Sequence, residues 1–332
     1  MSKRILLPTP DFTPQRGGVA RYLSALKQVL GENIVIKYWP TNFPRGKKLV
    51  KKIQTLAVDY DEIWTSHIYP IGNALRKIRK PYLVMLHGMD FDLARRNIAR
   101  AYFARKILKK AKVVTVNSQA LANEVKKFCG VDSLVVYPVV SDALIKTSHI
   151  PNRLNRKTVK LLTVGRLVER KGHLKILEVL KNLRDVKYLI VGDGEMKTEI
   201  LKKIAEYKLE DQVELRTEVA DEDLPEIYKE ADIFVMPTSK TNTDREGFGI
   251  VYLEAGLFGL PSIAVNHPGV DEAVLDNETG ILINDSQEEL KSAIIRLVEN
   301  QSLCLKMGLA GRDRTLAEFT AEAQFQKLQK LI

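Results

Sequence analysis

Cysteine and long apolar runs are scarce in this sequence. Its 332 residues include two cysteines, Cys129 and Cys304, which stand far apart. Two distant cysteines cannot hold together a small disulfide-rich domain, and the N-terminal segment lacks the apolar core of a signal peptide. No apolar run approaches the roughly 18 residues of a membrane-spanning helix. We therefore expect a cytoplasmic protein whose contact with a membrane, if it makes one, is peripheral and on the inner face.

Low-complexity tracts and repeats are absent as well. Hydrophobic residues make up 45% of the chain and charged residues 28%. This composition excludes a disordered, collagen-like or coiled-coil protein. A length of 332 residues predicts about two globular domains, each large enough to bury its own core.

Acidic residues are few in the first half of the chain. Residues 1–150 carry 26 basic and 10 acidic side chains, whereas residues 151–332 carry 26 and 31. Clusters of basic residues suit the phosphates of lipid head groups or of nucleic acid, and they equally suit solvated helix faces. The sequence shows no recognisable nucleic-acid-reading motif, so we expect no nucleic acid partner and keep a basic face for anionic polymers as an alternative class. The clusters are Lys47, Lys48, Lys51 and Lys52; Arg76, Lys77, Arg79 and Lys80; Arg95, Arg96 and Arg100; and Arg105, Lys106, Lys109 and Lys110.

Short runs rich in valine, isoleucine and leucine alternate with helical patterns along the chain. This alternation predicts parallel sheets that are covered by helices on both faces. The expected strands are 3–7, 33–38, 61–66, 82–87, 112–117 and 133–137, followed after a linker at 141–157 by 159–165, 187–192, 212–216, 232–236, 261–265 and 279–283.

The pattern predicts two doubly wound, Rossmann-like α/β domains that face a central cleft. The first domain would span 1–152 and the second 153–312. A helical stretch from about 301 closes the chain, and its last part, 313–332, would form a tail that could return to the first domain. Because ligands of such sheets bind beyond the carboxyl ends of the strands, the loops at those ends are the places to search for a site.

A glycine pair ends the loop after the first strand, where the sequence reads PTPDFTPQRGGVARYL. Gly17 and Gly18 would let the backbone approach a bulky ligand at the start of a helix, whose N–H groups suit a phosphate. A glycine pair at a helix start is also a common turn. The three-glycine fingerprint of dinucleotide binding is not present here, which argues against NAD chemistry.

Two cations follow the first strand of the second domain, in the segment GRLVERKGH. Arg166 and Lys171 could neutralise a diphosphate, although a pair of surface cations is the simpler alternative. Glycines accompany them, because Gly165 precedes Arg166, and Gly192 ends the next strand in a similar loop. These glycines favour a ligand-binding loop.

The most specific motif is EGFGIVYLE at 246–254. Glu246 would lie in a loop and Glu254 in the second turn of a helix that begins near Gly249, both at the rim of the cleft. Carboxylates accept hydrogen bonds from sugar hydroxyls, and the backbone from Gly247 to Ile250, including Phe248, offers N–H groups to oxygens. A buried Glu254 would need a ligand hydroxyl or a cation as its partner.

Together these motifs resemble the retaining glycosyltransferases of family four, which have the GT-B fold. The resemblance covers nearly the whole chain, and it also includes His87-Gly88 with Asp90, and Asn117-Ser118. It implies that Arg166 and Lys171 hold the donor diphosphate, that Glu254 holds the ribose, and that Glu246 with Phe248 and Gly249 holds the transferred sugar. His87 would face that sugar, and Gly17 and Gly18 would allow closure over the diphosphate.

The mechanism that the resemblance implies is front-face substitution with retention, without a metal or any cofactor besides the nucleotide sugar. Arg166 and Lys171 would stabilise charge on the departing diphosphate, which would accept the proton of the incoming hydroxyl. The segments PDFTPQRGGVARYL and DREGFGIVYLEAG look most like the phosphatidylinositol mannosyltransferases, which implies GDP-mannose as donor. Arg216-Thr217 and His267-Pro268-Gly269 depart from the family pattern, which puts the base in doubt. UDP-glucose or UDP-N-acetylglucosamine as donor, or an epimerase of this fold, are alternatives.

The acceptor is expected on the basic first half, as a glycan or a lipid-linked molecule. Asp90 and Arg21 are the candidate acceptor residues. The positive charge would attract an anionic membrane, and apolar residues among the cations could insert shallowly or could equally be core positions of amphipathic helices. These residues are Phe43, Leu49, Ile53, Ile98 and Phe103.

Overall fold

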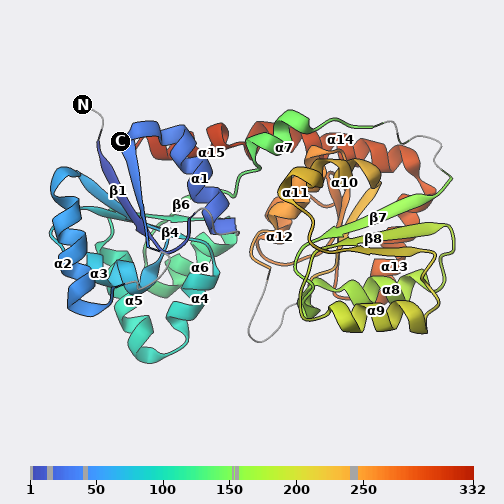
Figure 1. Cartoon of the computed structure of the whole chain (residues 1–332), viewed down its shortest axis with the longest axis horizontal. Coiled ribbons are helices and arrows are strands. Elements are labelled where there is room, and N and C mark those ends of the chain that lie inside the picture. The colour runs from blue at the N-terminus through green and yellow to red at the C-terminus, as the bar shows by residue number, and fades with distance from the viewer. Residues whose placement is uncertain (1–2, 13–17, 40–43, 152, 154–156, 240–245) are drawn as a thin grey trace. The chain divides into compact units, whose positions relative to one another are not determined.

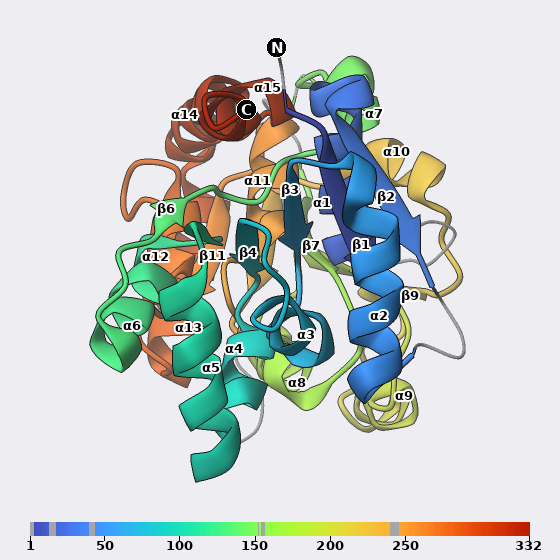
Figure 2. The ribbon, with the colours of Figure 1, turned by 90° about the vertical axis from the view of Figure 1, so that its left-hand side faces the viewer.

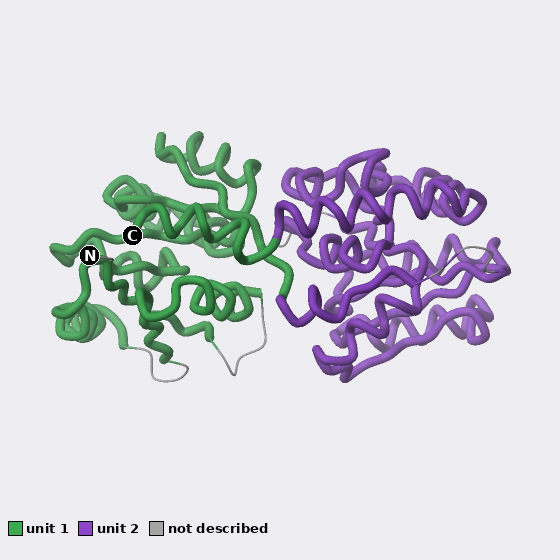
Figure 3. Tube along the Cα trace, turned by 90° about the horizontal axis from the view of Figure 1, so that it is seen from above, with its two compact units in different colours: residues 1–141, 320–332 green, residues 142–319 purple. Residues whose placement is uncertain are grey.

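The computed structural model describes residues 3–12, 18–39, 44–151, 153, 157–239 and 246–332. The chain divides into two compact units, which Figure 3 shows in different colours. Unit 1 comprises residues 1–141 and 320–332, and unit 2 comprises residues 142–319. The sequence-based division placed these boundaries at 152 and 313. A short helix, α7 (Asp142–Thr147), lies in the expected linker and opens unit 2.

Unit 1 contains a six-stranded parallel sheet with the strand order β2-β1-β3-β4-β5-β6 (Figure 1). Its strands are β1 (Ile5–Thr9), β2 (Ile34–Tyr38), β3 (Glu62–Thr65), β4 (Tyr82–Leu86), β5 (Val113–Val116) and β6 (Leu134–Val135). The helices that cover the sheet are α1 (Gly18–Leu30), α2 (Gly46–Leu56), α3 (Asn73–Leu75), α4 (Met89–Arg95), α5 (Ile98–Lys110), α6 (Gln119–Cys129) and α15 (Ala321–Gln329).

Alternating side chains of β1 divide the core of unit 1 between the two faces of the sheet, as strand geometry requires. Ile5 and Leu7 pack against α1 and α15, whereas Leu6 packs on the opposite face, where α2 to α6 lie. Figure 2, with unit 1 toward the viewer, shows α2 and α3 on that second face. The last helix of the chain therefore completes the core of the first unit.

Unit 2 repeats the architecture with the strand order β12-β11-β10-β7-β8-β9. Its strands are β7 (Val159–Val164), β8 (Val186–Val191), β9 (Val213–Arg216), β10 (Ile233–Met236), β11 (Ser262–Val265) and β12 (Gly280–Ile283). Its helices besides α7 are α8 (His173–Leu180), α9 (Lys197–Glu206), α10 (Leu224–Glu230), α11 (Ile250–Leu257), α12 (Val270–Ala273), α13 (Gln287–Glu299) and α14 (Gln301–Glu318). Both predicted sheets are thus confirmed, each strand lying within two residues of its expected position.

Each sheet reverses its winding direction at one point. In unit 1 the chain winds outward from β1 to β2 and then from β3 to β6, so the reversal lies between β1 and β3. In unit 2 the corresponding point lies between β7 and β10. Loops at such a point diverge to opposite faces and leave a crevice at the carboxyl ends of the strands, where ligands of open α/β sheets bind. Within the described ranges, no helix is long and apolar enough to span a bilayer.

Candidate functional site

The loop after β7 carries two buried cations, Arg170 and Lys171, in a single 3₁₀ turn. Gly172 ends this turn with φ of 74°, in the left-handed region that favours glycine. A Cβ at this position would lie 2.4 Å from the carbonyl oxygen of Pro237. Glycine at 172 therefore lets the loop after β7 pack closely on the loop after β10, across the reversal point of the sheet.

Glu246, in the loop after β10, holds both cations. Its Oε2 atom lies 2.5 Å from Nη1 of Arg170 and 2.7 Å from Nζ of Lys171. The side chain of Glu246 is 13% exposed, that of Arg170 10% and that of Lys171 8%. Such charged groups are stable away from water only when they are paired. The sequence reasoning assigned Glu246 to a sugar and did not single out Arg170, although Arg170 directly precedes Lys171.

Burial and charge act together on these groups. Burial lowers the pKa of the Lys171 ammonium, and the charges of Arg170 and Arg166 lower it further against the opposing effect of Glu246. Burial alone would raise the pKa of the Glu246 carboxyl, but Lys171 and Arg170 bring it below its ordinary value. Arg166 itself is exposed. Two buried cations, Arg170 and Lys171, therefore share the carboxylate of Glu246, and the charge of Arg166 acts on Lys171 from nearby.

The segment from Gly247 to Ile250 leads from Glu246 into α11. Phe248 is buried, and its ring centroid lies 5.8 Å from that of Phe319. Gly249 precedes the first residue of α11 and has φ of 80°. The helix thus begins where the sequence predicted, and the buried Phe248 ring anchors its N-terminal end.

Glu254 lies in the second turn of α11, as expected, and is buried, with 5% of its surface exposed. Its Oε2 atom accepts a hydrogen bond of 2.9 Å from the hydroxyl of Tyr228 in α10. The ring of Tyr228 stacks on Phe258 with the centroids 5.2 Å apart. The expected ligand hydroxyl or cation is therefore matched, in part, by a tyrosine of the same unit.

Gly192 owes its identity to close backbone packing, because a Cβ on it would lie 2.0 Å from the carbonyl oxygen of Gly165. Gly165 itself has φ of 154°, a conformation that favours glycine. The N–H groups are also engaged, because Gly165 donates to the carbonyl of Val191 and Gly192 donates to the carbonyl of Arg216. These two N–H groups therefore extend the sheet.

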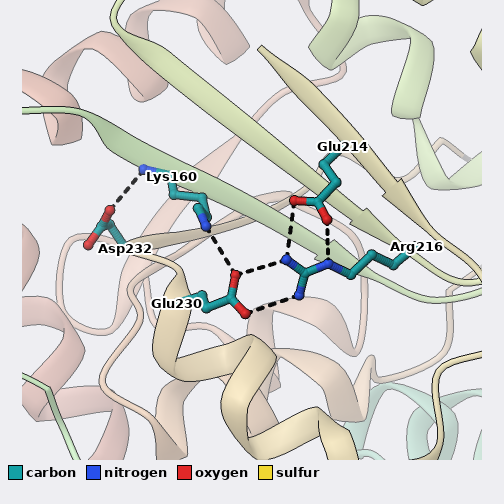
Figure 4. A network of polar contacts seen from close by, with 5 residues as sticks. All are labelled: Lys160, Glu214, Arg216, Glu230 and Asp232. Carbon is teal, nitrogen blue, oxygen red and sulfur yellow. Dashed lines mark hydrogen bonds and ion pairs between the residues drawn. The ribbon is translucent and has the colours of Figure 1, made fainter. Parts of the chain in front are cut away.

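Arg216 ends β9 within a network of ion pairs (Figure 4). Its guanidinium binds both oxygens of Glu214, at 2.6 and 3.2 Å, and both oxygens of Glu230, at 3.0 and 3.1 Å. Glu230 also accepts from Nζ of Lys160, and the backbone N–H of Lys160 donates to Asp232. Hydrogen bonds to the two glutamates raise the pKa of Arg216. The departure from the family pattern at 216 is thus part of a structured network.

In unit 1, His87 and Asp90 follow β4. The Asp90 carboxylate accepts a 3.1 Å hydrogen bond from the backbone N–H of His87, and the ring of His87 packs edge-on against Tyr22 of α1. Within the described part of the chain, Nε2 of His87 and Oδ2 of Asp90 are buried without a hydrogen-bond partner. Burial lowers the pKa of His87 to about 4 and raises that of Asp90 to about 6. Both groups thus favour their neutral forms.

Asp11 and His67, which the sequence reasoning missed, pair across the reversal point of unit 1. Oδ2 of Asp11, after β1, lies 2.9 Å from Nε2 of His67, after β3. Nδ1 of His67 lies 2.9 Å from the hydroxyl of Ser66. The hydrogen bond to His67 lowers the pKa of Asp11. The observed strand order explains the pair, because it brings the ends of β1 and β3 side by side.

The remaining predicted residues of unit 1 lie nearby in the chain. Gly17 falls outside the described residues. Gly18 begins α1, and among the described residues no atom outside its chain neighbours and its own helix lies within 4 Å of a Cβ placed on it. Arg21 is exposed in the first turn of α1. Nδ2 of Asn117 donates to the carbonyl of His87 at 3.1 Å, which ties the ends of β4 and β5 together.

Known proteins resemble this chain along its whole length. A GDP-mannose-dependent alpha-(1-6)-phosphatidylinositol monomannoside mannosyltransferase of Mycobacterium tuberculosis is 26% identical, over 98% of this chain and 97% of that protein. A GDP-mannose-dependent monoacylated alpha-(1-6)-phosphatidylinositol monomannoside mannosyltransferase of Corynebacterium glutamicum is also 26% identical, over 100% and 98%. The resemblance is therefore distant but full-length.

Solved structures share the fold. HepE from Anabaena, in complex with UDP and glucose, superposes with a TM-score of 0.77 at 20% identity, over 99% of both chains. The sucrose-phosphate synthase of Thermosynechococcus elongatus gives 0.79 at 22% identity, over 99% and 98%. The predicted GT-B fold, with its two doubly wound domains, is confirmed.

Two family models match the chain in succession. The model for Glycosyltransferase Family 4 matches residues 12–143, and the model for Glycosyl transferases group 1 matches residues 145–314, which is more than half of the chain. By these matches the chain belongs to the family 4 glycosyltransferases, enzymes that transfer a sugar from a nucleotide sugar.

Proposed function

We propose that this enzyme transfers mannose from GDP-mannose, with retention of configuration, to a hydroxyl of a glycan or lipid-linked acceptor. The observation that carries the donor half is the buried cluster of Arg170, Lys171 and Glu246 at the reversal point of unit 2. Its two cations, with Arg166 nearby, are the side chains that suit a diphosphate. Mannose and guanosine are supported by the names of the mycobacterial and corynebacterial relatives.

The cluster explains how the leaving group would be stabilised. When a diphosphate binds, Lys171 and Arg166 offer it two cations, and electrostatic stabilisation of developing charge is a large source of catalysis. Lys171 would then turn from Glu246 toward the phosphate. The freed carboxylate of Glu246 would accept hydrogen bonds from hydroxyls of the sugar. No metal is required in this scheme, because the cations neutralise the departing diphosphate, which accepts the proton of the attacking hydroxyl.

Other residues would position the donor and the acceptor. Glu254 would hold the ribose, with Tyr228 as its partner inside the unit. Gly18, at the start of α1, would let the backbone approach the diphosphate closely. His87 is neutral at pH 7, because its pKa is about 4, and can therefore exchange hydrogen bonds with a sugar hydroxyl without adding charge. Asp90 and Arg21 would position the acceptor.

A thermal-shift screen tests the donor assignment. GDP-mannose and GDP should raise the melting temperature by about 5 to 10 °C at a hundredfold excess over Kd. The Arg166→Ala and Glu254→Ala variants should lose this shift. Arg184→Ala is the matched control, because Arg184 is an exposed arginine of unit 2 in the connection between α8 and β8.

The outcomes separate the alternatives. A shift by UDP-glucose or UDP-N-acetylglucosamine alone would replace GDP-mannose as donor, and the Anabaena structure with UDP and glucose is the observation that favours this second assignment. Turnover of the donor without any acceptor would indicate an epimerase. No shift with any nucleotide would refute the diphosphate assignment.

A further inference from the structure

Large apolar side chains are exposed on α4 and α5. Of the eight large hydrophobic residues that are exposed in the described part of the chain, five lie on these two adjacent helices. They are Met89 (62% exposed), Leu93 (37%), Ile98 (90%), Tyr102 (51%) and Phe103 (37%). Figure 1 shows both helices at the lower margin of unit 1. Clustered exposure of this kind indicates a binding surface, whereas single exposed apolar residues do not.

The first half of α5 is inverted relative to an ordinary amphipathic helix. Its inward positions there are the small residues Ala101 and Ala104, while Ile98, Tyr102 and Phe103 point outward. Burial of apolar surface contributes about 25 cal/mol per Å² to stability, so the protein in water is less stable with these side chains exposed than it would be with them buried. The exposed apolar residues of α5 therefore suit contact with an apolar phase outside the protein better than they suit the core of unit 1.

Cations surround these apolar residues. Residues 89–110 include seven basic and two acidic side chains. Of the acidic ones, Asp92 pairs with Arg95, and Asp90 accepts from the backbone of His87. Cations also lie over the exposed rings, with Nζ of Lys106 at 4.4 Å from the centroid of Tyr102 and the guanidinium of Arg76 at 4.8 Å from that of Phe103. The surface is thus basic and apolar at once.

The basic helices α2 and α9 do not combine several exposed apolar residues with their cations. On α2 the lysines point outward, but Leu49 and Ile53 are 1% and 0% exposed and belong to the core. The sequence left open whether the apolar residues among the cations insert into a membrane or pack in the core. Leu49 and Ile53 pack in the core, whereas Ile98 and Phe103 are exposed. Phe43 lies outside the described residues. On α9 a single apolar residue, Leu201, is exposed beside Lys202 and Lys203.

We propose that the outward face of α4 and α5 docks on an anionic lipid bilayer. This α4–α5 face consists of Met89, Leu93, Ile98, Tyr102 and Phe103 with Arg96, Arg100 and Lys106. Cations interspersed with apolar side chains fit a bilayer surface, where the cations meet anionic head groups and the apolar groups reach the acyl boundary. Tyrosine is favoured at this interface, because its ring is apolar and its hydroxyl is polar.

The α4–α5 face continues into the candidate site of unit 1. Helix α4 begins at Met89, two residues after His87, and its second residue is Asp90. A bilayer on this face would therefore lie beside the candidate acceptor residues, and a lipid-linked acceptor could present its head group there. That consequence rests on the proposed function, whereas the docking itself does not.

Vesicle flotation tests the docking. The whole protein is mixed with vesicles of phosphatidylcholine, or of phosphatidylcholine and phosphatidylglycerol in equal parts, and the bound fraction is measured against lipid concentration. We expect binding to the anionic vesicles alone, weakened by salt. Each basic residue contributes about 1 kcal/mol, or about fivefold, near an anionic surface, so Arg96→Gln with Arg100→Gln should weaken binding more than about tenfold. Ile98→Ser with Tyr102→Ser should weaken it similarly.

Two variants are matched controls. Lys48→Gln with Lys51→Gln removes two exposed cations from α2, and Leu201→Ser with Lys202→Gln removes an exposed apolar residue and a cation from α9. Both should change binding less than about threefold, since neither helix combines the two features. All the substituted side chains are exposed, so circular dichroism should show a native fold for every variant.

Several results would overturn the docking. These are equal binding to both kinds of vesicle, an effect of the α2 control as large as that of the α5 variants, or loss of self-association in the Ile98→Ser, Tyr102→Ser variant with unchanged vesicle binding. The last result would assign the face to a second copy of the chain. If GDP-mannose raises the melting temperature but vesicles are not bound, only the docking is refuted. If vesicles are bound but GDP-mannose does not raise the melting temperature, only the proposed donor is refuted.

Discussion

The polar groups that are buried at the carboxyl ends of the two sheets are accommodated in opposite ways. Unit 2 keeps its groups charged and pairs them, since Arg170 and Lys171 share the carboxylate of Glu246. Unit 1 lets burial shift His87 and Asp90 toward their neutral forms, with pKa values of about 4 and 6. Pairing keeps the buried groups of unit 2 charged, whereas burial favours the neutral forms in unit 1.

The same contrast holds for the surfaces of the units. By the division of the structure, unit 1 carries 27 basic and 10 acidic residues and unit 2 carries 25 and 31. Burial thus favours the neutral forms of His87 and Asp90 in unit 1, although that unit carries many more basic than acidic residues. Unit 2 carries more acidic than basic residues, yet two of its buried cations share one carboxylate. Local burial and pairing, and not the net charge of the unit, set the electrostatics of each site.

The largest expected effect concerns the paired charges of unit 2. Glu246→Gln removes the carboxylate that two buried cations share, and we expect the free energy of unfolding of unit 2 to fall by about 3 to 5 kcal/mol, as for other broken buried ion pairs. Trp39 and Trp64, the two tryptophans of the chain, both lie in unit 1, so tryptophan emission reports that unit. Denaturation followed by circular dichroism should shift, and the tryptophan transition should not.

The matched control is Glu214→Gln, which removes one partner of Arg216 but acts on a side chain that is 56% exposed. An exposed pair of this kind contributes about 1 kcal/mol or less. Equal losses of unfolding free energy from the two substitutions would contradict the expectation that burial makes the ion pairs of Glu246 contribute more to stability.

The buried carboxylate of Glu254 gives the next effect. Tyr228→Phe removes the hydroxyl that donates to it, and loss of a hydrogen bond to a charged group should lower the free energy of unfolding of unit 2 by about 1.5 to 3 kcal/mol. Tyr207→Phe, at the end of α9, is the control, because its hydroxyl bonds to the exposed Glu178. Denaturant titrations of both variants should show a loss for Tyr228 and little change for Tyr207.

Asp90 tests the neutral site of unit 1. Its pKa in the folded state, about 6, lies above its ordinary value, so its contribution to stability is complete at low pH and is lost as the pH rises through 6. Asp90→Asn stays neutral and keeps the acceptor for the N–H of His87. Relative to wild type it should therefore gain about 1 to 2 kcal/mol between pH 4 and pH 7, measured by tryptophan emission. A difference that does not depend on pH would contradict the raised pKa.

The smallest effect is expected for the partly exposed pair in unit 1. His67 lowers the pKa of Asp11, so this pairing stabilises the fold above the ordinary pKa of an aspartate and is lost as the pH falls through the lowered value. Asp11→Asn should reduce the stability of unit 1 by about 1 kcal/mol or less at pH 7. The difference from wild type should vanish in acid, and its persistence there would assign Asp11 a role other than the ion pair.

Much of the architecture followed from local patterns. Alternation of apolar runs and helical segments placed all the strands, because a strand that is covered on both faces needs a short continuous apolar run. The start of α11 followed from the glycines before it, and Glu246 was placed in a loop and Glu254 in the second turn. The motifs also indicated the family, which the full-length relatives and both family models support.

Partners of the charged residues did not follow from the sequence. Arg170 and Lys171 bind the carboxylate of Glu246, about 75 positions later in the sequence. Asp11, after β1, contacts His67, after β3. Gly192 resembled a ligand-binding glycine, but its place is decided by the carbonyl of Gly165 on the neighbouring strand. Each of these contacts depends on the sheet order, which brings the ends of non-consecutive strands together.

The sequence by itself determined the elements, the two doubly wound sheets and the loops that carry the site, since periodicity and glycine positions are local properties of the backbone. Only the tertiary structure decided which charges are paired, which polar groups become neutral, that Glu254 lies inside unit 2, that α15 completes unit 1, and that α5 exposes Ile98 while α2 buries Ile53. These properties depend on desolvation, and desolvation is set by neighbours that are distant in the sequence.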